Sequence, residues 1–324
     1  MTGIDHQVRS LIDAAIKQIA SDNASGAAEI LRHAGAVFGL LKAASAEIAV
    51  GNLERAQKAV IETGVAIALA QPAMSPLLKL ASAVISAARI ATSAAESLES
   101  AENAALDFVE KAKRGARDSA SRAVTMISDG ATVLTHSRSS TVLAAFVEAR
   151  LGGKKFSVVA TESRPMLEGR SLAGSLSDSD ISVTLIADAA ASLAMEQVDL
   201  ILVGSDTITP ANVVNKIGTR MIALAARERG LPMYAICDTS KFICEESVGL
   251  KSRHSGTESE LWPETPSGVK VLNSYFEPTP LANFTAIITE DGALSIEEAA
   301  RRAREASIDE ELLKALEVLR DGVR

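Results

Sequence analysis

The second half of the chain alternates short apolar runs with helical stretches, and this alternation restricts the possible folds more than any other feature. The runs, rich in residues that favour β-strands, are residues 131–137, 155–163, 181–189, 198–206, 232–240 and 284–292. Helical patterns, such as residues 140–153 and 215–230, separate most of them. Continuous apolar strands that alternate with helices predict a parallel sheet covered on both faces. The expected fold class is therefore α/β.

The first half, up to about Val124, is rich in alanine and carries almost no strand signal. Its apolar residues recur at helical spacing. The clearest stripe is Val8, Leu11, Ile12, Ala15, Ile16 and Ile19. A length of 324 residues is enough for two domains. We expect an all-helical domain of five or six helices over residues 1–124, followed by the sheet domain over residues 125–324.

The composition argues against several classes of partner. Hydrophobic residues make up 47% and charged residues 23%, which is a normal globular balance. The net charge is −8 and no basic patch is visible, so we expect neither nucleic acid nor a membrane as a partner. The spacing of Cys237 and Cys244 fits no common zinc or redox motif. No apolar run is long enough to span a bilayer. The expectation is a cytoplasmic protein with reduced thiols, and no motif indicates a metal or a cofactor.

Polar residues gather at the carboxyl ends of the expected strands. They are His136 and Ser137; Thr161, Glu162, Ser163 and Arg164; Asp188; Gly204, Ser205 and Asp206; and Asp238, Thr239 and Lys241. In an open parallel sheet the ligand site lies beyond these ends. A single residue of this kind is more often a cap or a turn residue, because loops are polar in general. Five polar strand ends together favour a binding site, with ordinary loop polarity as the alternative.

The stretch "NKIGT", from Asn215 to Thr219, is expected to open a helix. A helix N-terminus offers free N–H groups and a partial positive charge, and Gly218 permits close approach of a ligand. Lys216 adds a full positive charge, so the combination suits a phosphate group. The alternative is a lysine that only extends from a helix start into solvent.

Asp206 follows Gly204, which allows the backbone to turn sharply after the strand. Its carboxylate could hold Lys216 in place, or could exchange a proton with a sugar hydroxyl. Arg138 and Arg164 supply further positive charge, and arginine suits bidentate contacts with phosphate. The predicted ligand is a small phosphorylated metabolite.

Four stretches together resemble one known family. They are "DGATVLTHSRSSTVL", "VVATESRPMLEGRSLA", "DLILVGSDTITPANVVNKIGTRMIALAARERGLPMY" and "YFEPTPLANFTAIITEDG". The chain is similar to the family of the alpha, beta and delta regulatory subunits of eukaryotic translation initiation factor 2B. That family also contains isomerases for methylthioribose 1-phosphate and ribose 1,5-bisphosphate. The resemblance implies a helical N-terminal domain, a Rossmann-like C-terminal domain, and a homodimer or higher homo-oligomer, because residues 276–292 resemble the dimer-forming region of the family. We expect residues 269–292 to lie at a two-fold interface.

The resemblance also implies roles for individual residues. In the isomerases a cysteine works with an aspartate, and here those positions hold Ser137 and Asp206. Phosphate-binding arginines of the N-terminal domain are replaced here by Ala24 or Ser25 and by Gln71. The candidate catalytic residues are thus Asp206 and Ser137. The candidate ligand-binding residues are Asn215, Lys216, Arg164, Ser25, Gly26, His136 and Gly204.

Two functions fit this pattern. The first is an aldose-1-phosphate to ketose-1-phosphate isomerase, or a close variant of one, in which Asp206 protonates the ring oxygen and Ser137 orients a sugar hydroxyl. The second is a non-catalytic regulatory subunit that senses a phosphorylated sugar or a nucleotide. Ser137 favours the second function, because a hydroxyl is a far weaker acid than a thiol and needs a base beside it.

Overall fold

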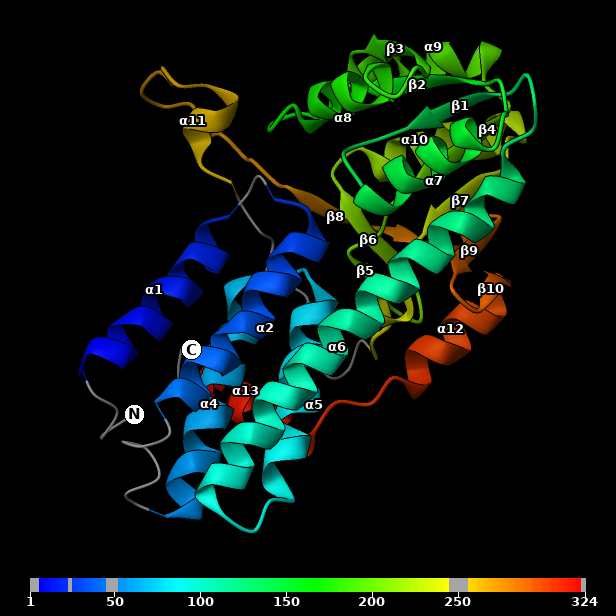
Figure 1. Ribbon diagram of the computed structural model, residues 1–324. Helices are drawn as coiled ribbons and strands as arrows, with labels where there is room; N and C mark the ends of the chain where they lie inside the picture. The colour runs from blue at the N-terminus through cyan, green and yellow to red at the C-terminus, as the bar shows by residue number, and fades with distance from the viewer. Residues whose placement is uncertain (1–5, 23–24, 45–51, 245–255, 322–324) are drawn as a thin grey trace. The chain divides into compact units, whose positions relative to one another are not determined.

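Residues 6–22, 25–44, 52–244 and 256–321 are described by the computed structural model of the chain (Figure 1). They fall into two compact units. Among the described residues, the first unit contains those up to 113 and from 306 onwards, and the second contains 114–244 and 256–305.

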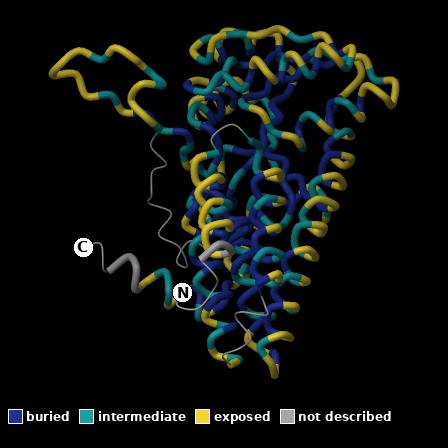
Figure 2. Tube along the Cα trace, turned by 60° about the vertical axis from the view of Figure 1, so that its left-hand side comes forward, coloured by how far each residue is buried: buried dark blue, intermediate teal, exposed yellow. Residues whose placement is uncertain are grey.

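The first unit is built from amphipathic helices. They are α1 (His6–Ser21), α2 (Ala27–Ala43), α4 (Leu53–Ala70), α5 (Ser75–Arg89), the first part of α6 (Ala94–Ala123) and α13 (Glu310–Asp321). Each of the first four buries one stripe of its surface, and Ile12, Phe38, Ile67 and Leu80 are fully buried. Figure 2 shows this as buried and exposed residues that alternate along the helical parts of the trace. The predicted helical N-terminal region is confirmed.

The C-terminal helix belongs to the first unit. The carboxylate of Asp309, just before α13, accepts a hydrogen bond from Ser86 Oγ of α5 at 2.6 Å. The backbone N–H of Asp309 donates to Ser82 Oγ at 2.8 Å, and Arg89 lies 3.5 Å from its carboxylate. The compact units therefore divide the chain differently from the predicted boundary at residue 124, which grouped residues 306–324 with the sheet.

The second unit contains the predicted sheet. Its strands lie in the order β10-β9-β7-β4-β1-β2-β3, and all neighbours are parallel except β10 and β9. Their bounds are β1 (Thr132–Thr135), β2 (Ser157–Thr161), β3 (Ser182–Ile186), β4 (Leu200–Val203), β7 (Met233–Ile236), β9 (Ala286–Thr289) and β10 (Gly292–Leu294). Each of the six predicted apolar runs contains one of the six parallel strands. The α/β fold class is confirmed.

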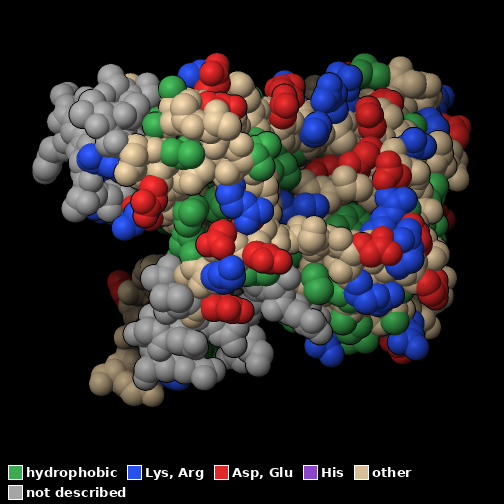
Figure 3. Space-filling view, turned by 90° about the horizontal axis from the view of Figure 1, so that it is seen from below, with side chains coloured by type: hydrophobic (Ala, Val, Ile, Leu, Met, Phe, Trp, Pro, Cys, Tyr) green, Lys and Arg blue, Asp and Glu red, His purple; other side chains and the backbone are tan. Residues whose placement is uncertain are grey.

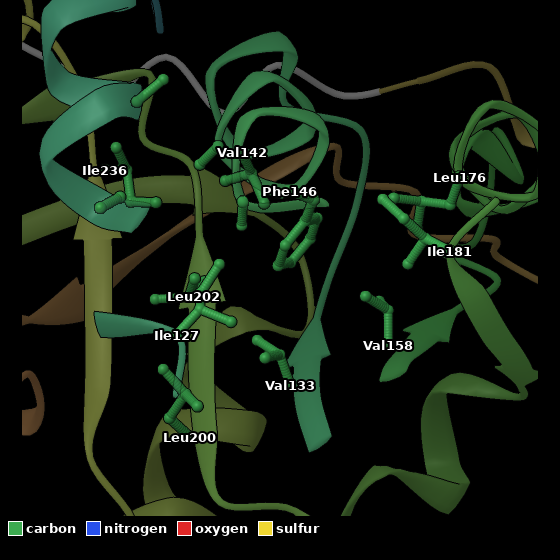
Figure 4. Close-up of a cluster of buried hydrophobic side chains, with 14 of the residues drawn as sticks. Ile127, Val133, Val142, Phe146, Val158, Leu176, Ile181, Leu200, Leu202 and Ile236 are labelled. Carbon is green, nitrogen blue, oxygen red and sulfur yellow. The ribbon is translucent and has the colours of Figure 1, made fainter. Parts of the chain in front are cut away.

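Both faces of the inner strands of the sheet are buried, whereas the edge strand β3 is exposed or half-buried along its length. On one face, Phe146 of α7 (Ser140–Leu151) and Leu176 of α8 (Glu168–Ser177) belong to a cluster with the strand residues Val133 and Leu202 (Figure 4). Strand residues that point to the other face, such as Ile201, are also fully buried. Two-sided burial explains why these strands read as continuous apolar runs. Further helices of this unit are α9 (Ala191–Ala194), α10 (Thr219–Arg229), α11 (Glu258–Leu261) and α12 (Ile296–Glu305).

A second, smaller sheet corrects one local prediction. Asn215 and Lys216, which were expected to open a helix, instead end β6 (Asn212–Lys216), which pairs antiparallel with β5 (Thr207–Ile208) and β8 (Phe276–Pro280). Helix α10 begins only at Thr219, after Gly218 has adopted a φ of +104°. β8 and β9 lie within residues 269–292, and the predicted role of this region in self-association stays a prediction.

Charged side chains of both signs lie on the surface. On the face drawn in Figure 3, acidic and basic side chains are interspersed. Across the described part of the chain, no helix is both long enough and apolar enough to cross a membrane.

Candidate functional site

Glu168 is the centre of a polar cluster at the carboxyl ends of the strands. It is the first residue of α8, which follows β2. Its Oε1 accepts a hydrogen bond from Ser137 Oγ at 2.8 Å, and the same oxygen lies 2.8 Å from Lys216 Nζ. The side chains of Lys216 and Glu168 are only 9% and 18% exposed. The structure thus joins the end of β1, the start of α8 and the end of β6 through one carboxylate.

The loops that carry this cluster hold left-handed backbone conformations. Ser137, Ser163 and Leu167 have φ values of 66°, 64° and 59°. The N–H of Ser137 donates to Ser163 Oγ at 2.8 Å. The carboxylate of Asp188 accepts from the N–H groups of Ser163 and Arg164 at 2.7 and 2.8 Å. Such conformations cost about 1–3 kcal/mol each for residues other than glycine, and they cluster at functional sites.

His136 lies inside the protein rather than open to a ligand. It is 1% exposed. Its Nε2 lies 2.8 Å from the carbonyl oxygen of Ile217, and its Nδ1 lies 2.6 Å from Thr161 Oγ1. Since a carbonyl only accepts, Nε2 carries the proton and Nδ1 accepts from the threonine hydroxyl. Both ring nitrogens are therefore engaged, which favours a structural role over the predicted ligand contact.

Burial lowers the pKa of His136, although the Ile217 carbonyl and the Asp188 and Glu168 carboxylates oppose this shift. A histidine with a lowered folded-state pKa stabilises the fold above its unfolded pKa of about 6.5, and that stability is lost as the pH falls. We expect the free energy of unfolding to fall below that pH by up to about 1.4 kcal/mol per pH unit from this group.

Urea unfolding at several pH values between neutral and mildly acidic measures this slope. His136→Gln should flatten it, and the same substitution at His33 of α2 is the matched control. Equal slopes for wild type and His136→Gln would contradict the assignment.

Asp206 follows β4 and is partly buried. Its burial raises the pKa of the carboxyl group, the nearby Lys241 and Lys216 lower it in part, and Glu168 raises it further. Its backbone N–H donates to the carbonyl of Val214 on β6 at 3.0 Å, which fixes the residue against the small sheet. A carboxyl that keeps its proton to a higher pH than usual can act as a general acid.

Two buried lysines lie near Asp206. Lys216 and Lys241 are each 7% exposed. The ammonium group of Lys216 also lies 5.4 Å from the ring centre of Tyr275 and 6.0 Å from that of Phe276, within the range of cation–π attraction. Phe276, at the start of β8, and Tyr275, just before it, thus help to fix Lys216 beside Glu168.

The start of α10 differs from the predicted phosphate site. The N–H groups of Gly218 and Arg220 both donate to Oε1 of Glu277, at 2.7 and 2.9 Å. Asn215 Nδ2 donates to Thr219 Oγ1 at 3.0 Å. A carboxylate of the protein therefore satisfies two of the N–H groups that were expected to be free for a ligand. The positive charge in this region comes from the lysines, not from this helix end.

Other predicted residues lie apart from the cluster or pack against the protein. A Cβ on Gly204 would approach Ser139 Oγ to 2.7 Å, so close packing requires a glycine there. Ser139 caps α7. The exposed Arg164 donates to the carbonyl of Leu261 at 3.4 Å.

The remaining candidates lie in the first unit. The Ser25 N–H donates to Asp22 at 2.8 Å, and Gly26 is the N-cap of α2. Gln71 donates to the carbonyls of Ile19 and Asp22, both at 3.1 Å. Ala24 lies outside the described residues. These interactions hold α1, α2 and the end of α4 together.

The sequence interpretation did not single out Glu168. Its one signal was the position after "TESRPML", at the start of the helix that follows a strand with a polar carboxyl end. Lys241 was noted as a polar strand-end residue, but its proximity to Asp206 was not foreseen.

Comparisons with known proteins agree with this architecture. Residues 14–296 match the model of the initiation factor 2 subunit family. The chain is 40% identical over 196 residues to ribose 1,5-bisphosphate isomerase of Archaeoglobus fulgidus. The aligned region covers 57% of this chain and 62% of that protein. It is 36% identical over 187 residues to methylthioribose-1-phosphate isomerase of Syntrophotalea carbinolica, covering 52% of this chain and 54% of that one.

The crystal structure of the Pyrococcus horikoshii translation initiation factor eIF-2B superposes with a TM-score of 0.75 and 27% identity, over 88% of this chain and 97% of that one. The matches to the two isomerases each span less than two thirds of those proteins. The family model, in contrast, extends over most of both units. The chain therefore belongs to the initiation factor 2 subunit family.

Proposed function

We propose that this chain is an aldose-1-phosphate to ketose-1-phosphate isomerase or a close variant of one. The observation that carries the proposal is the environment of Asp206, a partly buried acid with a raised pKa that lies near two buried lysines. An acid that keeps its proton to a higher pH than usual, next to positive charge, suits a phosphorylated sugar whose ring must open. Two relatives that carry isomerase names support the same reaction class.

In this reaction Asp206 donates its proton to the ring oxygen. Lys216 and Lys241 attract the phosphorylated ligand to the strand ends, and the exposed Arg164 is available to contact phosphate at the rim. Ser137 lies at the end of β1, as the resemblance implies for the cysteine position. Its hydroxyl donates to Glu168, so its proton is directed to that carboxylate and not to a sugar hydroxyl.

The alternative is a non-catalytic, regulatory-subunit-like protein that senses a phosphorylated sugar or a nucleotide. Two observations favour it: serine stands in the cysteine position, and Glu168 already neutralises Lys216. The solved structure that carries a translation-factor name supports the same alternative.

Product formation from a panel of aldose 1-phosphates distinguishes the two functions. We expect wild type to form a ketose 1-phosphate from at least one of them. Ser137→Ala should slow turnover by about tenfold or more, because it removes a hydrogen bond to a charged group. Ser137→Cys should preserve or raise turnover, since a thiol titrates nearer neutral pH than a hydroxyl.

Ser140→Ala, at an exposed position in the first turn of α7, is the matched control. Absence of ketose from wild type and both Ser137 variants, with sugar-phosphate binding intact, would exclude the isomerase and leave the sensor.

A further inference from the structure

The second carboxylate oxygen of Glu168 has no role in the reaction described above. Oε1 accepts from Ser137 and pairs with Lys216. Oε2 is buried and has no hydrogen-bond partner among the described residues. Nearly all buried polar atoms are hydrogen-bonded, because an unpaired one loses its interaction with water without compensation. A buried oxygen of this kind, in a cluster of charged groups at the strand ends, indicates a group that acts on a ligand.

The backbone around Glu168 fixes where that oxygen lies. Leu167, just before it, has a left-handed φ of 59°. Gly169, just after it, packs so closely that a Cβ would lie 1.8 Å from the carbonyl oxygen of Thr161. Ser137 and Lys216 then hold Oε1 from two other elements. With one oxygen held from two sides, the other is presented in a fixed direction.

We propose that Glu168 is the base of the isomerisation and that Oε2 carries the proton between the two reacting carbon atoms of the sugar. The assignment rests on the proposed isomerase function and supplies the proton carrier that Ser137 cannot provide. Asp206 acts as the acid, so the two carboxyl groups divide the proton transfers between them.

Asp206 gives its proton to the ring oxygen, and the bond from C1 to that oxygen breaks with its electron pair going to the oxygen. Oε2 of Glu168 takes the proton from C2, and the C–H electron pair forms a C1–C2 double bond, which neutralises the positive charge at C1.

The C2 hydroxyl then returns a proton to the Asp206 carboxylate. The C2–O electrons form the ketone, and C1 takes the proton from Glu168. Both side chains recover their starting states, and the phosphate stays on C1 throughout. The substrate class is therefore a phosphorylated cyclic aldose with a hydrogen and a free hydroxyl on C2.

Lys216 has a defined part in these steps. It provides the counter-charge for the Glu168 carboxylate at 2.8 Å, and it is itself fixed by the Tyr275 and Phe276 rings. When Glu168 holds the proton, the charge of Lys216 becomes available to the phosphate or to the developing negative charge on the sugar. Lys216 is therefore a positioning residue for the base before it binds the substrate.

The test compares Glu168→Gln with wild type in ketose formation from an aldose 1-phosphate, run in D₂O. Glutamine keeps the size and an acceptor for Ser137 but cannot take a proton. We expect turnover to fall by about 10²–10⁴-fold, the usual effect of removing a general base. The ketose that the wild-type protein forms should carry deuterium at C1. A proton held on the Glu168 carboxyl group exchanges with the solvent, whereas a hydride that passed directly from C2 to C1 would not.

The matched control is Glu196→Gln. The exposed Glu196 lies in the turn before β4, pairs with Arg229 at 3.5 Å, and contacts neither Ser137 nor Lys216 in any described interaction. Its turnover should equal that of wild type.

Binding of inorganic phosphate, measured by calorimetry, separates a catalytic from a structural role. Glu168→Gln should bind phosphate at least as tightly as wild type, because Lys216 loses its competing carboxylate.

The outcomes are distinct. If wild type turns over and Glu168→Gln keeps its rate, the assignment of the base is wrong while the isomerase proposal stands. If Glu168→Gln loses turnover, phosphate binding and thermal stability all at once, Glu168 is only structural, and the assignment is again overturned. If wild type forms no ketose from any aldose 1-phosphate, the isomerase proposal fails and the assignment fails with it.

Discussion

Asp206→Asn is expected to lower the turnover of an aldose 1-phosphate by about 10²–10⁴-fold, with a much smaller change in ligand binding. Asparagine keeps the shape of the side chain and removes the transferable proton. Because burial raises the pKa of Asp206, the protonated acid persists above the usual aspartate value of about 3.9. The wild-type kcat/KM should therefore fall as the pH rises through this raised pKa. The same decrease of kcat/KM with pH should be absent in the variant.

Asp199→Asn is the matched control for this experiment. Asp199 precedes the same strand, β4, at its amino end, and its exposed carboxylate accepts the Thr132 N–H at 2.8 Å. It should leave kcat unchanged. If Asp206→Asn weakens ligand binding and stability as strongly as turnover, Asp206 is a structural partner of the lysines and not an acid.

Gly169→Ala is expected to lower the free energy of unfolding of the second unit. The loss should exceed the usual cost of overpacking, which is about 1–3 kcal/mol. The added Cβ would lie 1.8 Å from the Thr161 carbonyl oxygen and 2.9 Å from its carbon, and both are backbone atoms that a side-chain rotation cannot move. The first turn of α8 must shift, and Glu168 must shift with it. Urea unfolding measures the loss of stability, and the transition should move to lower denaturant concentration.

Gly174→Ala tests the same substitution in the same helix. No atom lies within 4 Å of a Cβ at that position, and its φ is not in the left-handed region. Alanine there should be neutral or should stabilise by about 0.5–1 kcal/mol, because glycine is the weaker helix former. Similar effects at the two glycines would show that α8 is free to move and that the contact with Thr161 is not tight.

Local patterns in the sequence were sufficient to find the main sheet. The inner parallel strands β1, β2, β4 and β7 are mostly apolar runs, because both of their faces are buried, and the carboxyl end of each is marked by a change to polar residues. The same logic located Ser137 and Asp206 at the ends of β1 and β4. Such features depend on neighbours a few residues away, which a single sequence displays.

The parts that were not predicted depend on contacts between distant segments. The strand β6 exists because β8 pairs with it, and the N–H groups at the start of α10 are satisfied by Glu277 of β8. The residues near Asn215 carry no sequence signal for the pairing with β8 or for the hydrogen bonds to Glu277. The helical spacing of the apolar residues that follow therefore suggested a helix start. Glu168 likewise looks like an ordinary acidic residue in a first helical turn. Only the folded chain brings Ser137 and Lys216 to it.

The return of α13 to α4 and α5, fixed by Asp309, makes the helical unit discontinuous along the chain. During synthesis on a ribosome, α1, α2, α4 and α5 emerge first, and domains generally fold in the order in which they are made. Here the apolar surface of α4 and α5 that α13 covers stays open until the whole sheet has been translated. The unit that is synthesised first is thus the one completed last, and it depends on the sheet being made without interruption.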